Sequence, residues 1–440
     1  MYLFSQGHSS FNGAATSIGP SNINRLQPTW HWRVPPSPNS GTTALLASPT
    51  VVNGVVYIGA KDGLFYAVRE ATQKPIWSRF LGIVTPKGRC SPETKGITST
   101  ADAARDPATG KLTIYVNAAD GYLYALDAAT GHTVWKGLVG VPSPTANDYY
   151  AWSTPLVAQG KVYVGISSDC DTPLVPAGLL AFDQRTGHRV AWWHSLPSGQ
   201  SGASIWSSPA ASGRAIFATT GNHLGTEQPL YADSIVKLDG SNLHLLDYWQ
   251  VPASEQAYDA DFGASPTMFT ARLNGVTVPM VGVCNKNGLF YALRRDHLSA
   301  GPVWKTRITR TYVSGSPQCL AAAIWDGTRL IVGGGDKITI NGKTYDGSVV
   351  SLNPATGKPI WRTGLAGGVL GTPTEDGSGV VAAPIHSGAT GVYLLDARTG
   401  KILHHISLPH APVWAQPVFA GKDLLVAGPE SIGLTAYGIK

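Results

Sequence analysis

The chain has 440 residues, of which 14% are charged and 43% are hydrophobic, and it contains 51 Gly and 31 Pro. This turn-rich composition is typical of an all-β protein, and no stretch shows sustained helical periodicity or is apolar for long enough to cross a membrane. The net charge of +6 is spread along the chain without runs of Lys or Arg. We therefore expect a solvated, mildly basic surface and no nucleic-acid partner.

The first residues do not have the basic and apolar regions of a signal peptide. We expect either a cytoplasmic chain or one from which a signal has been removed. An Asn, Ser and Gly-rich loop follows and leads into Leu26-Gln27-Pro28-Thr29-Trp30-His31-Trp32. This segment is predicted to be a single closing strand.

A strand-start motif, in which a small or polar residue precedes Pro and an apolar run, then recurs along the chain. Counting two degenerate copies, it occurs eight times, mostly about fifty to fifty-seven residues apart, a period typical of propellers and solenoids. The copies are Ser48-Pro49, Ser99-Thr100-Ala101, Thr154-Pro155, Ser208-Pro209, Ser265-Pro266, Cys319-Leu320-Ala321, Thr372-Pro373 and Gln416-Pro417.

A second pattern, first seen from Val55 to Trp77, repeats in step with the strand starts. It has an apolar strand, a turn at Asp62-Gly63, an alternating strand, a second turn and a closing Trp, which is the pattern of a hairpin with a docking aromatic residue. The last copy has His404 where a Trp is expected. The other copies carry the turns Asp120-Gly121, Asn287-Gly288 and Asp346-Gly347 and the closing residues Trp135, Trp193, Trp249, Trp304 and Trp361.

A four-stranded unit of this length cannot bury both of its faces alone, so the copies must stack. We predict an all-β, eight-bladed β-propeller of four-stranded antiparallel blades, a single domain over 1–440 with 1–36 as closing strand and loop and 37–440 as blades. The last copy, Val413 to Tyr437, has no closing strand of its own, and Trp30 and Trp32 supply one. The two ends of the chain are therefore expected to pair within one blade.

The four cysteines, Cys90, Cys170, Cys284 and Cys319, show neither CxxC nor CxxCH spacing, which argues against structural zinc and against covalently attached haem. Their even number fits two disulfides in an oxidising compartment, and the alternative is buried, reduced thiols.

The Asp-Gly turn, the run Tyr124-Ala125-Leu126-Asp127-Ala128-Ala129-Thr130-Gly131 and the closing Trp together resemble the repeat of quinoprotein propellers, the dehydrogenases that depend on pyrroloquinoline quinone (PQQ). The resemblance covers nearly the whole chain. From Cys170 to Phe262 the sequence is similar to polyvinyl-alcohol dehydrogenase and its soluble relatives, and the fused cytochrome domain of some family members is absent.

The resemblance implies a cofactor and metal site. Trp206 matches the Trp that forms the floor under the quinone, Asn222 matches a calcium ligand, and Lys286 matches the cation that hydrogen-bonds the quinone oxygens. Asp259 matches the carboxylate that accepts the alcohol proton and helps to hold the metal, with Asp261 as a rival two residues on. The alternatives are a core Trp, a turn Asn and an exposed hairpin Lys.

Thr154 and Ser204 match hydroxyl residues that hold the cofactor carboxylates, and both are alternatively strand-start residues with local hydrogen bonds. The second calcium ligand of the family, a Glu, falls near Cys170, where only Asp169 and Asp171 are available. The adjacent-cysteine disulfide of methanol dehydrogenases is absent, because Cys90 precedes a Ser.

The resemblance thus implies PQQ-dependent oxidation of an alcohol, with Ca²⁺ as second cofactor and a dye or cytochrome c as electron acceptor. The alternatives are a non-catalytic scaffold for protein partners and a different enzyme on the same fold, such as a tetrathionate hydrolase-like activity. Loop positions near the predicted cofactor mouth and neighbouring strand starts suggest the disulfides Cys90–Cys170 and Cys284–Cys319, although four cysteines permit three pairings. An extracytoplasmic location, periplasmic or secreted, would follow.

Overall fold

The computed structural model describes residues 2–36, 43–85, 94–143, 147–171, 173–223, 229–310, 319–388, 390–409, 413–429 and 431–440. The chain divides into two compact units. Unit 1 comprises Met1–Tyr2 and Val34–Val251, and unit 2 comprises Leu3–Arg33 and Pro252–Lys440. Each unit is described by itself.

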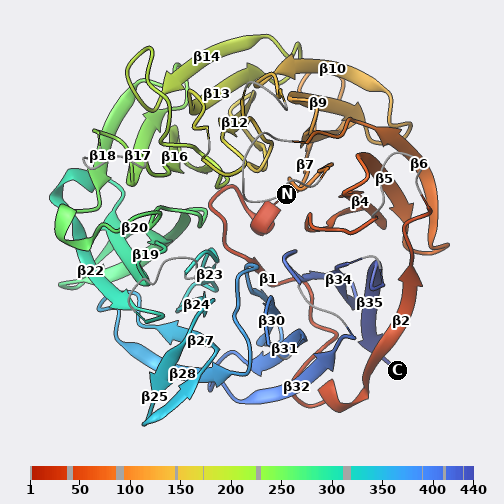
Figure 1. Ribbon diagram of the computed structural model, residues 1–440. Coiled ribbons are helices and arrows are strands. Elements are labelled where there is room, and N and C mark those ends of the chain that lie inside the picture. Colours follow the sequence, from red (N-terminus) through yellow and green to blue (C-terminus); the bar gives the residue numbers. More distant parts are fainter. Residues whose placement is uncertain are drawn as a thin grey trace. The chain divides into compact units, whose positions relative to one another are not determined.

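Within its described residues, unit 1 holds four antiparallel sheets of four strands each. In this unit β4, β7, β12 and β16 lie on the inner side and β6, β10, β14 and β18 lie on the outer side (Figure 1). Blade 1 is β3 (Thr50–Val52), β4 (Val55–Gly59), β5 (Leu64–Arg69) and β6 (Lys74–Phe80); blade 2 is β7 (Asp102–Arg105), β8 (Leu112–Asn117), β9 (Tyr122–Asp127) and β10 (Thr133–Leu138); blade 3 is β11 (Leu156–Ala158), β12 (Lys161–Ile166), β13 (Gly178–Asp183) and β14 (Arg189–His194); blade 4 is β15 (Ala210–Ser212), β16 (Ala215–Thr219), β17 (Ser234–Asp239) and β18 (Leu245–Gln250).

The described residues of unit 2 also form four such blades, with one inserted hairpin and one added inner strand. Blade 5 is β19 (Thr267–Leu273), β20 (Val276–Cys284), β21 (Leu289–Arg294) and β22 (Pro302–Arg307); blade 6 is β23 (Ile324–Trp325), β24 (Leu330–Gly334), β27 (Gly347–Leu352) and β28 (Pro359–Leu365), with the hairpin β25 (Ile338–Ile340) and β26 (Lys343–Tyr345) inserted; blade 7 is β1 (Phe11–Asn12), β29 (Thr374–Asp376), β30 (Val380–Ile385), β31 (Gly391–Asp396) and β32 (Ile402–Ser407); blade 8 is β33 (Val418–Ala420), β34 (Asp423–Ala427), β35 (Leu434–Ile439) and β2 (Leu26–Trp32).

Eight blades in the described residues confirm the predicted fold class, an all-β, eight-bladed propeller of four-stranded antiparallel blades. The description of residues 1–440 as a single domain stays a prediction. One detail was wrong, because Gly347 begins β27 after the inserted hairpin instead of forming a turn with Asp346. The helices in the described part of the chain are short 3₁₀ turns: η1 (Tyr2–Phe4), η2 (Ile23–Arg25), η3 (Ala253–Glu255) and η4 (Leu298–Ala300).

The predicted pairing of the two chain ends in one blade is confirmed in unit 2. Strand β2 pairs antiparallel with β35, and the register places Trp30 opposite Ala436 and Trp32 opposite Leu434. Both Trp side chains are buried. The N-terminal strand therefore gives blade 8 the outer strand that its own sequence lacks.

Residues 7–16, here called the N-terminal strap, were not predicted to be structured. The backbone of the strap accepts hydrogen bonds from the first strands of blades 5, 6 and 7: Met268 to Gly7 at 2.8 Å, Trp325 to Ser9 at 2.8 Å and Glu375 to Ser10 at 3.0 Å. Strand β1 then pairs in parallel with β29 (Figure 1). The strap covers inner strand edges that would otherwise be open to pairing with another chain.

The structure gives a physical reason for the Ser or Thr of the strand-start motif. In unit 1 the backbone N–H of Ser48 donates to the Thr100 hydroxyl at 3.0 Å, that of Thr100 to Thr154 at 3.1 Å and that of Thr154 to the Ser208 hydroxyl at 3.0 Å. Each hydroxyl thus satisfies a backbone donor of the preceding blade. The motif links neighbouring blades at the start of their first strands.

The closing Trp residues dock onto the turn of the next blade. In unit 1 the indole of Trp77 donates to the Ala128 carbonyl at 3.0 Å, and that of Trp135 donates to the Gln184 carbonyl at 3.0 Å. A side chain at Gly131 would place its Cβ 2.6 Å from Trp77, so only Gly fits against the docked ring. In unit 2, Trp304 and Trp361 make the same bond to Pro354 and Ala397.

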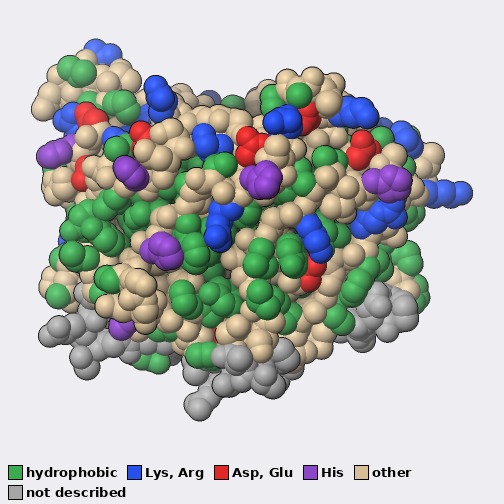
Figure 2. Space-filling view, turned by 90° about the horizontal axis from the view of Figure 1, so that it is seen from above, with side chains coloured by type: hydrophobic (Ala, Val, Ile, Leu, Met, Phe, Trp, Pro, Cys, Tyr) green, Lys and Arg blue, Asp and Glu red, His purple; other side chains and the backbone are tan. Residues whose placement is uncertain are grey.

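The hydrophobic core of each unit lies between neighbouring blades. One cluster in unit 1 joins Tyr57 and Trp77 of blade 1 to Ile114 and Leu126 of blade 2. Both faces of a middle strand such as β4 are buried, because each sheet packs against a neighbour on either side. On the face drawn in Figure 2, basic and acidic side chains are mixed with one another, in agreement with the even charge distribution of the sequence.

The predicted disulfide Cys284–Cys319 is confirmed, with a Cα–Cα distance of 5.4 Å. It joins the end of β20 in blade 5 to the segment that precedes β23 in blade 6. The other predicted pair requires Cys90, which lies outside the described residues. That pair stays a prediction.

Candidate functional site

Trp206 and Asn222, two of the predicted cofactor and metal residues, lie on loops of blade 4 that are hydrogen-bonded to each other. The Ala203 N–H donates to the Asn222 carbonyl at 2.9 Å, and the Gly221 N–H donates to the Ser204 carbonyl at 2.7 Å. Trp206 is half-buried, whereas Ile205 beside it is fully buried. A partly accessible indole on a braced loop fits the role of an aromatic platform better than that of a core Trp.

The side chain of Asn222 contacts Asp171, another predicted metal residue. The Asn222 amide Nδ2 donates to the Asp171 Oδ2 at 3.4 Å. Asp171 has a positive φ of 58° and follows strand β12 of blade 3. The structure therefore places an amide side chain beside a carboxylate, and the oxygens of these two groups are ligand types that Ca²⁺ accepts.

Thr154 and Ser204 are both buried and both already act as hydrogen-bond acceptors. The Thr154 hydroxyl accepts the Thr100 N–H, and the Ser204 hydroxyl accepts the Ser168 N–H at 3.2 Å. These are the local bonds of the alternative interpretation. A hydroxyl that accepts one bond still has a proton to donate, so a role toward a cofactor carboxylate remains chemically possible for each.

Asp169, the fourth predicted residue in unit 1, forms an ion pair with Lys95, which sequence reasoning did not select. Lys95 Nζ lies 2.5 Å from Asp169 Oδ1, 5.3 Å from the centroid of the Tyr150 ring and 5.2 Å from the centroid of the Trp152 ring. Burial raises the pKa of Asp169, and Lys95 offsets part of that rise. A cation held by Asp169 would be repelled by this ammonium, so Asp169 does not fit as a metal ligand.

Unit 2 carries the predicted base and the predicted quinone-binding cation in one ion cluster. Lys286 Nζ lies 2.7 Å from Asp259 Oδ1 and 2.6 Å from Asp261 Oδ1. The Asp259 side chain is 45% exposed, whereas that of Asp261 is 2% exposed. Asp259 is therefore the accessible carboxylate of the two, and the buried carboxylate of Asp261 holds Lys286 in place.

The same cluster sets the protonation states. Burial raises the pKa of Asp259, Lys286 lowers it, and the charge of Asp261 raises it again, with a net increase above the ordinary value. Burial alone would lower the pKa of Lys286, but the two carboxylates outweigh it and the pKa of Lys286 is raised. Lys286 is therefore a fixed cation, and Asp259 is a carboxylate with increased proton affinity. A base needs both accessibility and such an increase.

The backbone of Asp259 is also unusual, with a positive φ of 57°. This conformation is uncommon for a residue other than Gly, Asn or Asp. It lies in a tight turn between η3 and β19, next to the exposed Tyr258. Non-glycine residues in this conformation cluster at functional sites, which agrees with a role for Asp259 in binding or catalysis.

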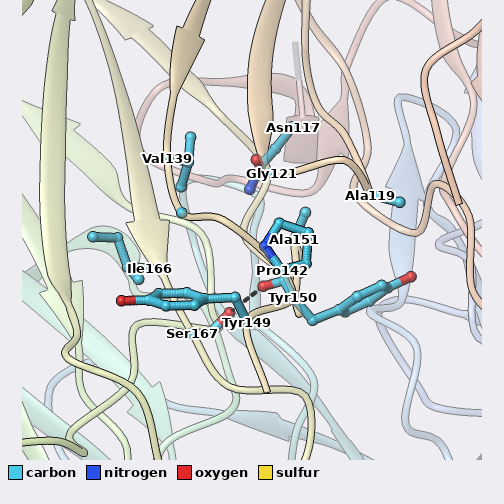
Figure 3. A pocket seen from close by; sticks show the side chains of 11 residues that line it. Asn117, Ala119, Gly121, Val139, Pro142, Tyr149, Tyr150, Ala151, Ile166 and Ser167 are labelled. Atoms are coloured by element: carbon cyan, nitrogen blue, oxygen red, sulfur yellow. Dashed lines mark hydrogen bonds between the residues drawn. The ribbon is translucent and has the colours of Figure 1, made fainter. Parts of the chain in front are cut away.

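A small pocket in unit 1 lies beside the Lys95–Asp169 pair and is not a cofactor site. Its lining includes Asn117, Tyr149, Tyr150 and Ser167, and its volume is about 10 Å³, which is room for roughly one water. Figure 3 shows the rings of Tyr149 and Tyr150 pointing in opposite directions, with the Ser167 hydroxyl bonded to the Tyr150 carbonyl at 2.8 Å. A tricyclic quinone cannot fit there.

No group of three or more His, Cys, Asp or Glu in the described part of the chain is arranged to hold a metal ion. No helix in the same residues is long and apolar enough to span a membrane. The contact between Asn222 and Asp171, which joins an amide to one carboxylate, is the calcium candidate among the described residues of unit 1.

Two family models match the chain. The model described as "Glucose/ethanol/alcohol dehydrogenase, beta-propeller domain" matches residues 1–311. The model described as "Outer membrane protein assembly factor BamB" matches residues 293–440.

Curated relatives are alcohol dehydrogenases that are longer than this chain. Quinohemoprotein alcohol dehydrogenase of Comamonas testosteroni is 30% identical over 191 residues, which are 41% of this chain and 23% of that protein. Quinohemoprotein alcohol dehydrogenase ADH IIB of Pseudomonas putida is 26% identical over 322 residues, which are 64% of this chain and 43% of that protein. The chain thus spans less than half the length of these two relatives.

Solved structures share the fold. The Comamonas testosteroni enzyme has a TM-score of 0.75 at 18% identity and covers 99% of this chain and 79% of its own, and a europium-containing methanol dehydrogenase has 0.75 at 16%, with coverages of 98% and 90%. BamB from Moraxella catarrhalis has a TM-score of 0.58 at 14% identity, with coverages of 94% and 99%. At these identities the likeness shows the fold alone.

Proposed function

Because the chain belongs to the glucose/ethanol/alcohol dehydrogenase β-propeller family, we propose that it oxidises an alcohol with PQQ as cofactor. The observation that carries the proposal is the ion cluster of Asp259, Lys286 and Asp261 in unit 2. It combines an accessible carboxylate with a fixed cation at the positions that the resemblance selects. An ordinary surface ion pair between Asp259 and Lys286 would need neither the buried carboxylate of Asp261 nor the positive φ of Asp259.

Asp259 is the proposed general base. Its carboxylate is the accessible member of the cluster, so it can reach the hydroxyl of a bound alcohol and accept the proton. Asp261 is the positioning residue, since its buried carboxylate holds Lys286 in place. This division of roles favours Asp259 over Asp261 as the general base.

Lys286 and Trp206 are the proposed contacts of the quinone. When bound, the quinone supplies the acceptor for the hydride that leaves the alcohol carbon. The ammonium of Lys286 is held by its ion pairs with Asp259 and Asp261, so it would present a fixed positive charge to a quinone oxygen. The half-buried indole of Trp206 provides a flat apolar surface. Thr154 and Ser204 would donate their hydroxyl protons to cofactor carboxylates.

Calcium is proposed as a second cofactor, held in unit 1 by Asn222 and Asp171. The contact between their side chains offers neutral and charged oxygens of the kind that a hard cation prefers. Asp169 is left out because Lys95 neutralises it. Asp259, the remaining predicted ligand, belongs to unit 2 and is proposed chiefly as the base.

The proposed electron acceptor is a cytochrome c, or a redox dye in the assay. One relative, from Thauera butanivorans, is named 1-butanol dehydrogenase (cytochrome c) and is 28% identical over 153 residues. An extracytoplasmic location is also proposed, and the Cys284–Cys319 disulfide supports it because disulfides persist in oxidising compartments.

The test is to titrate PQQ into the purified full chain with and without Ca²⁺, and then to measure alcohol-dependent dye reduction. We expect saturable binding with a bound-quinone absorption band, tighter in the presence of Ca²⁺, and turnover that requires the alcohol. Asn222→Leu should weaken the calcium effect and leave the fold intact. No saturable binding at high micromolar PQQ would contradict the proposal.

A non-catalytic scaffold is the second candidate function. The observation in its favour is the match of residues 293–440 to the BamB family model. This candidate predicts no PQQ binding and no effect of Asp259→Asn on any activity. The same titration therefore separates the two.

A further inference from the structure

Glu255, which lies four residues before Asp259, joins the loop of the proposed base to the turn that carries Lys286. It is the last residue of η3, and both its backbone and its side chain contact that turn. Its carbonyl oxygen accepts a hydrogen bond from the Asn287 amide Nδ2 at 3.1 Å, and its carboxylate Oε2 accepts one from the Tyr291 hydroxyl at 2.6 Å. Two segments that are 32 residues apart in the sequence are thus tied together next to Lys286.

The hydroxyl of Tyr291 bridges the two segments. The ring lies fully buried in β21, and its hydroxyl accepts a hydrogen bond from Asn287 Nδ2 at 2.7 Å while it donates to Glu255. Burial raises the pKa of Tyr291, and the bond to Glu255 raises it further, so the hydroxyl keeps its proton and acts as a donor. The amide of Asn287 is oriented by its own turn, because its Oδ1 accepts the Leu289 N–H at 3.0 Å.

Glu255 accepts these bonds as an ionised carboxylate. Burial raises the pKa of Glu255, but hydrogen bonds from Lys305 and Tyr291 outweigh burial, and the pKa is lowered. Lys305 of β22 forms an ion pair with Oε1, the oxygen that does not bind Tyr291. A hydrogen bond to an ionised acceptor is roughly twice as strong as one between neutral groups. The link between loop and turn is therefore of the stronger kind.

The turn held by Glu255 is the one that positions the ion cluster. The backbone N–H of Lys286 donates to the Asp261 carbonyl at 3.0 Å, and its ammonium lies 2.7 Å from Asp259 Oδ1. Asn287 is the next residue along the chain and carries the bond to Glu255. A shift of the loop against the turn would therefore change the distance between Lys286 and Asp259.

Blade 2 has the same turn without this link. There Asp120 stands where blade 5 has Asn287, and the Tyr124 hydroxyl donates to Asp120 Oδ2 at 2.6 Å within the turn itself. The backbone is alike, since the glycine that follows has a φ of 87° in blade 2 and 85° in blade 5. In blade 5 the amide donates to the Tyr291 hydroxyl, and that hydroxyl gives its proton to Glu255. The change from Asp to Asn thus replaces a bond within one turn by a bond between turn and loop.

We propose that Glu255 and Tyr291 are positioning residues, which fix the loop of Asp259 against the turn of Lys286 and so set the geometry in which Asp259 meets the alcohol. The inference rests on the proposed function, because it needs Asp259 to act as the base. Neither Glu255 nor Tyr291 is assigned a contact with the alcohol or the quinone. Their loss should therefore slow turnover more than it weakens alcohol binding.

The first experiment compares Tyr291→Phe with Tyr124→Phe, since each variant loses one hydroxyl that donates to a carboxylate and keeps the ring. With PQQ bound, Tyr291→Phe should lose about ten- to hundredfold in kcat, with KM for the alcohol changed by less than about threefold, because small displacements of reacting groups cost mainly rate. Tyr124→Phe should keep the kcat of the parent. An unchanged kcat in Tyr291→Phe, or an equal loss in both variants, would overturn the inference.

Variants of Glu255 test whether Tyr291 acts through it. Glu255→Gln can still accept the hydrogen bond from Tyr291 and should keep kcat within about fivefold of the parent, whereas Glu255→Ala should lose as much as Tyr291→Phe. The double variant with Ala and Phe should lose no more than either single variant, because the two residues act as one unit. Additive losses would overturn the inference.

A second readout uses no cofactor. The Lys286 N–H is protected from hydrogen exchange while it is bonded to the Asp261 carbonyl, so mass spectrometry of peptides 253–262 and 284–289 reports whether loop and turn stay together. Exchange in these peptides should be about tenfold faster in Tyr291→Phe, through the loss of a hydrogen bond to a charged group, and unchanged in Tyr124→Phe. Unchanged exchange in Tyr291→Phe would overturn the inference. If the parent shows no PQQ turnover but exchange rises in Tyr291→Phe, the proposed function fails and the link between loop and turn stands.

Discussion

Glu375 allows a pH-dependent prediction whose size follows from the structure. It lies in β29 with 3% of its surface exposed, and its Oε2 has no hydrogen-bond partner among the described residues. Burial raises the pKa of Glu375 from 4.5 to about 8, the charge of Asp326 adds to the rise, and Arg329 offsets only part of it. The folded state therefore keeps a proton that the unfolded state loses in this pH range.

The sign follows from linkage. Between pH 4.5 and 8 the folded chain binds more protons at this site than the unfolded chain, so the free energy of unfolding falls as pH rises and levels off above pH 8. At 1.36 kcal/mol per pKa unit the full loss is roughly 5 kcal/mol. Glu375→Gln has the shape of the protonated side chain and cannot ionise. It should match the parent near pH 4.5 and be more stable than the parent at pH 9 by up to that amount.

The assay is urea unfolding of both proteins at pH 4.5, 7 and 9. Asp396→Asn is a control with the opposite sign, because hydrogen bonds from Thr399 and Arg398 outweigh burial and lower the pKa of Asp396. That carboxylate stabilises the fold above its unfolded pKa, and its contribution is lost as pH falls. If Glu375→Gln shows the same stability difference from the parent at all three pH values, the reasoning about a protonated, buried Glu375 is refuted.

Three further predictions concern the fold. Gly131→Ala should lower the free energy of unfolding in urea by roughly 2–4 kcal/mol, because it strains a positive φ and pushes the new Cβ against Trp77. Gly160→Ala is the control, since Gly160 has a similar φ and nothing within 4 Å, and it should cost roughly 1–2 kcal/mol. Equal costs would contradict the docking of Trp77 against Gly131. Deleting residues 1–33 removes β1 and β2 and should abolish cooperative unfolding, as followed by circular dichroism; a sharp transition in the deletion variant would contradict the role of the paired ends. Non-reducing peptide mapping should recover the Cys284–Cys319 link, and free thiols at both would contradict it.

The fold could be predicted because its repeating residues have a repeating physical role. Gly131, Gly187, Gly357 and Gly400 of the Thr-Gly turns each make room for a docked indole. The Ser or Thr of three successive strand starts accepts a backbone N–H from the preceding blade. Such residues recur at a fixed period and can be counted in the sequence. The strap did not follow from the sequence, because it meets the first strands of blades 5, 6 and 7 through backbone carbonyls that any residue could supply.

The candidate site was predictable only where a residue matched a family motif. Trp206, Asn222, Lys286 and Asp259 were selected in this way, and the structure groups them as two pairs, one in each unit. Lys95 was missed because nothing local marks a Lys that meets its Asp from 74 residues away. The position of Tyr291 four residues after Asn287, equivalent to that of Tyr124 after Asp120, is a signal that the sequence did contain.

The measurement that tests the central claim most directly is PQQ-loaded turnover of Asp259→Asn beside the parent and Asp261→Asn. Asp259→Asn keeps the size of an accessible side chain but cannot take the alcohol proton, so PQQ should still bind and dye reduction should fall by about a hundred- to ten-thousand-fold. Asp261→Asn removes the buried partner of Lys286 and should change PQQ affinity more than proton transfer. If Asp259→Asn reduces dye as fast as the parent with the same amount of bound PQQ, Asp259 is not the base and the account is contradicted.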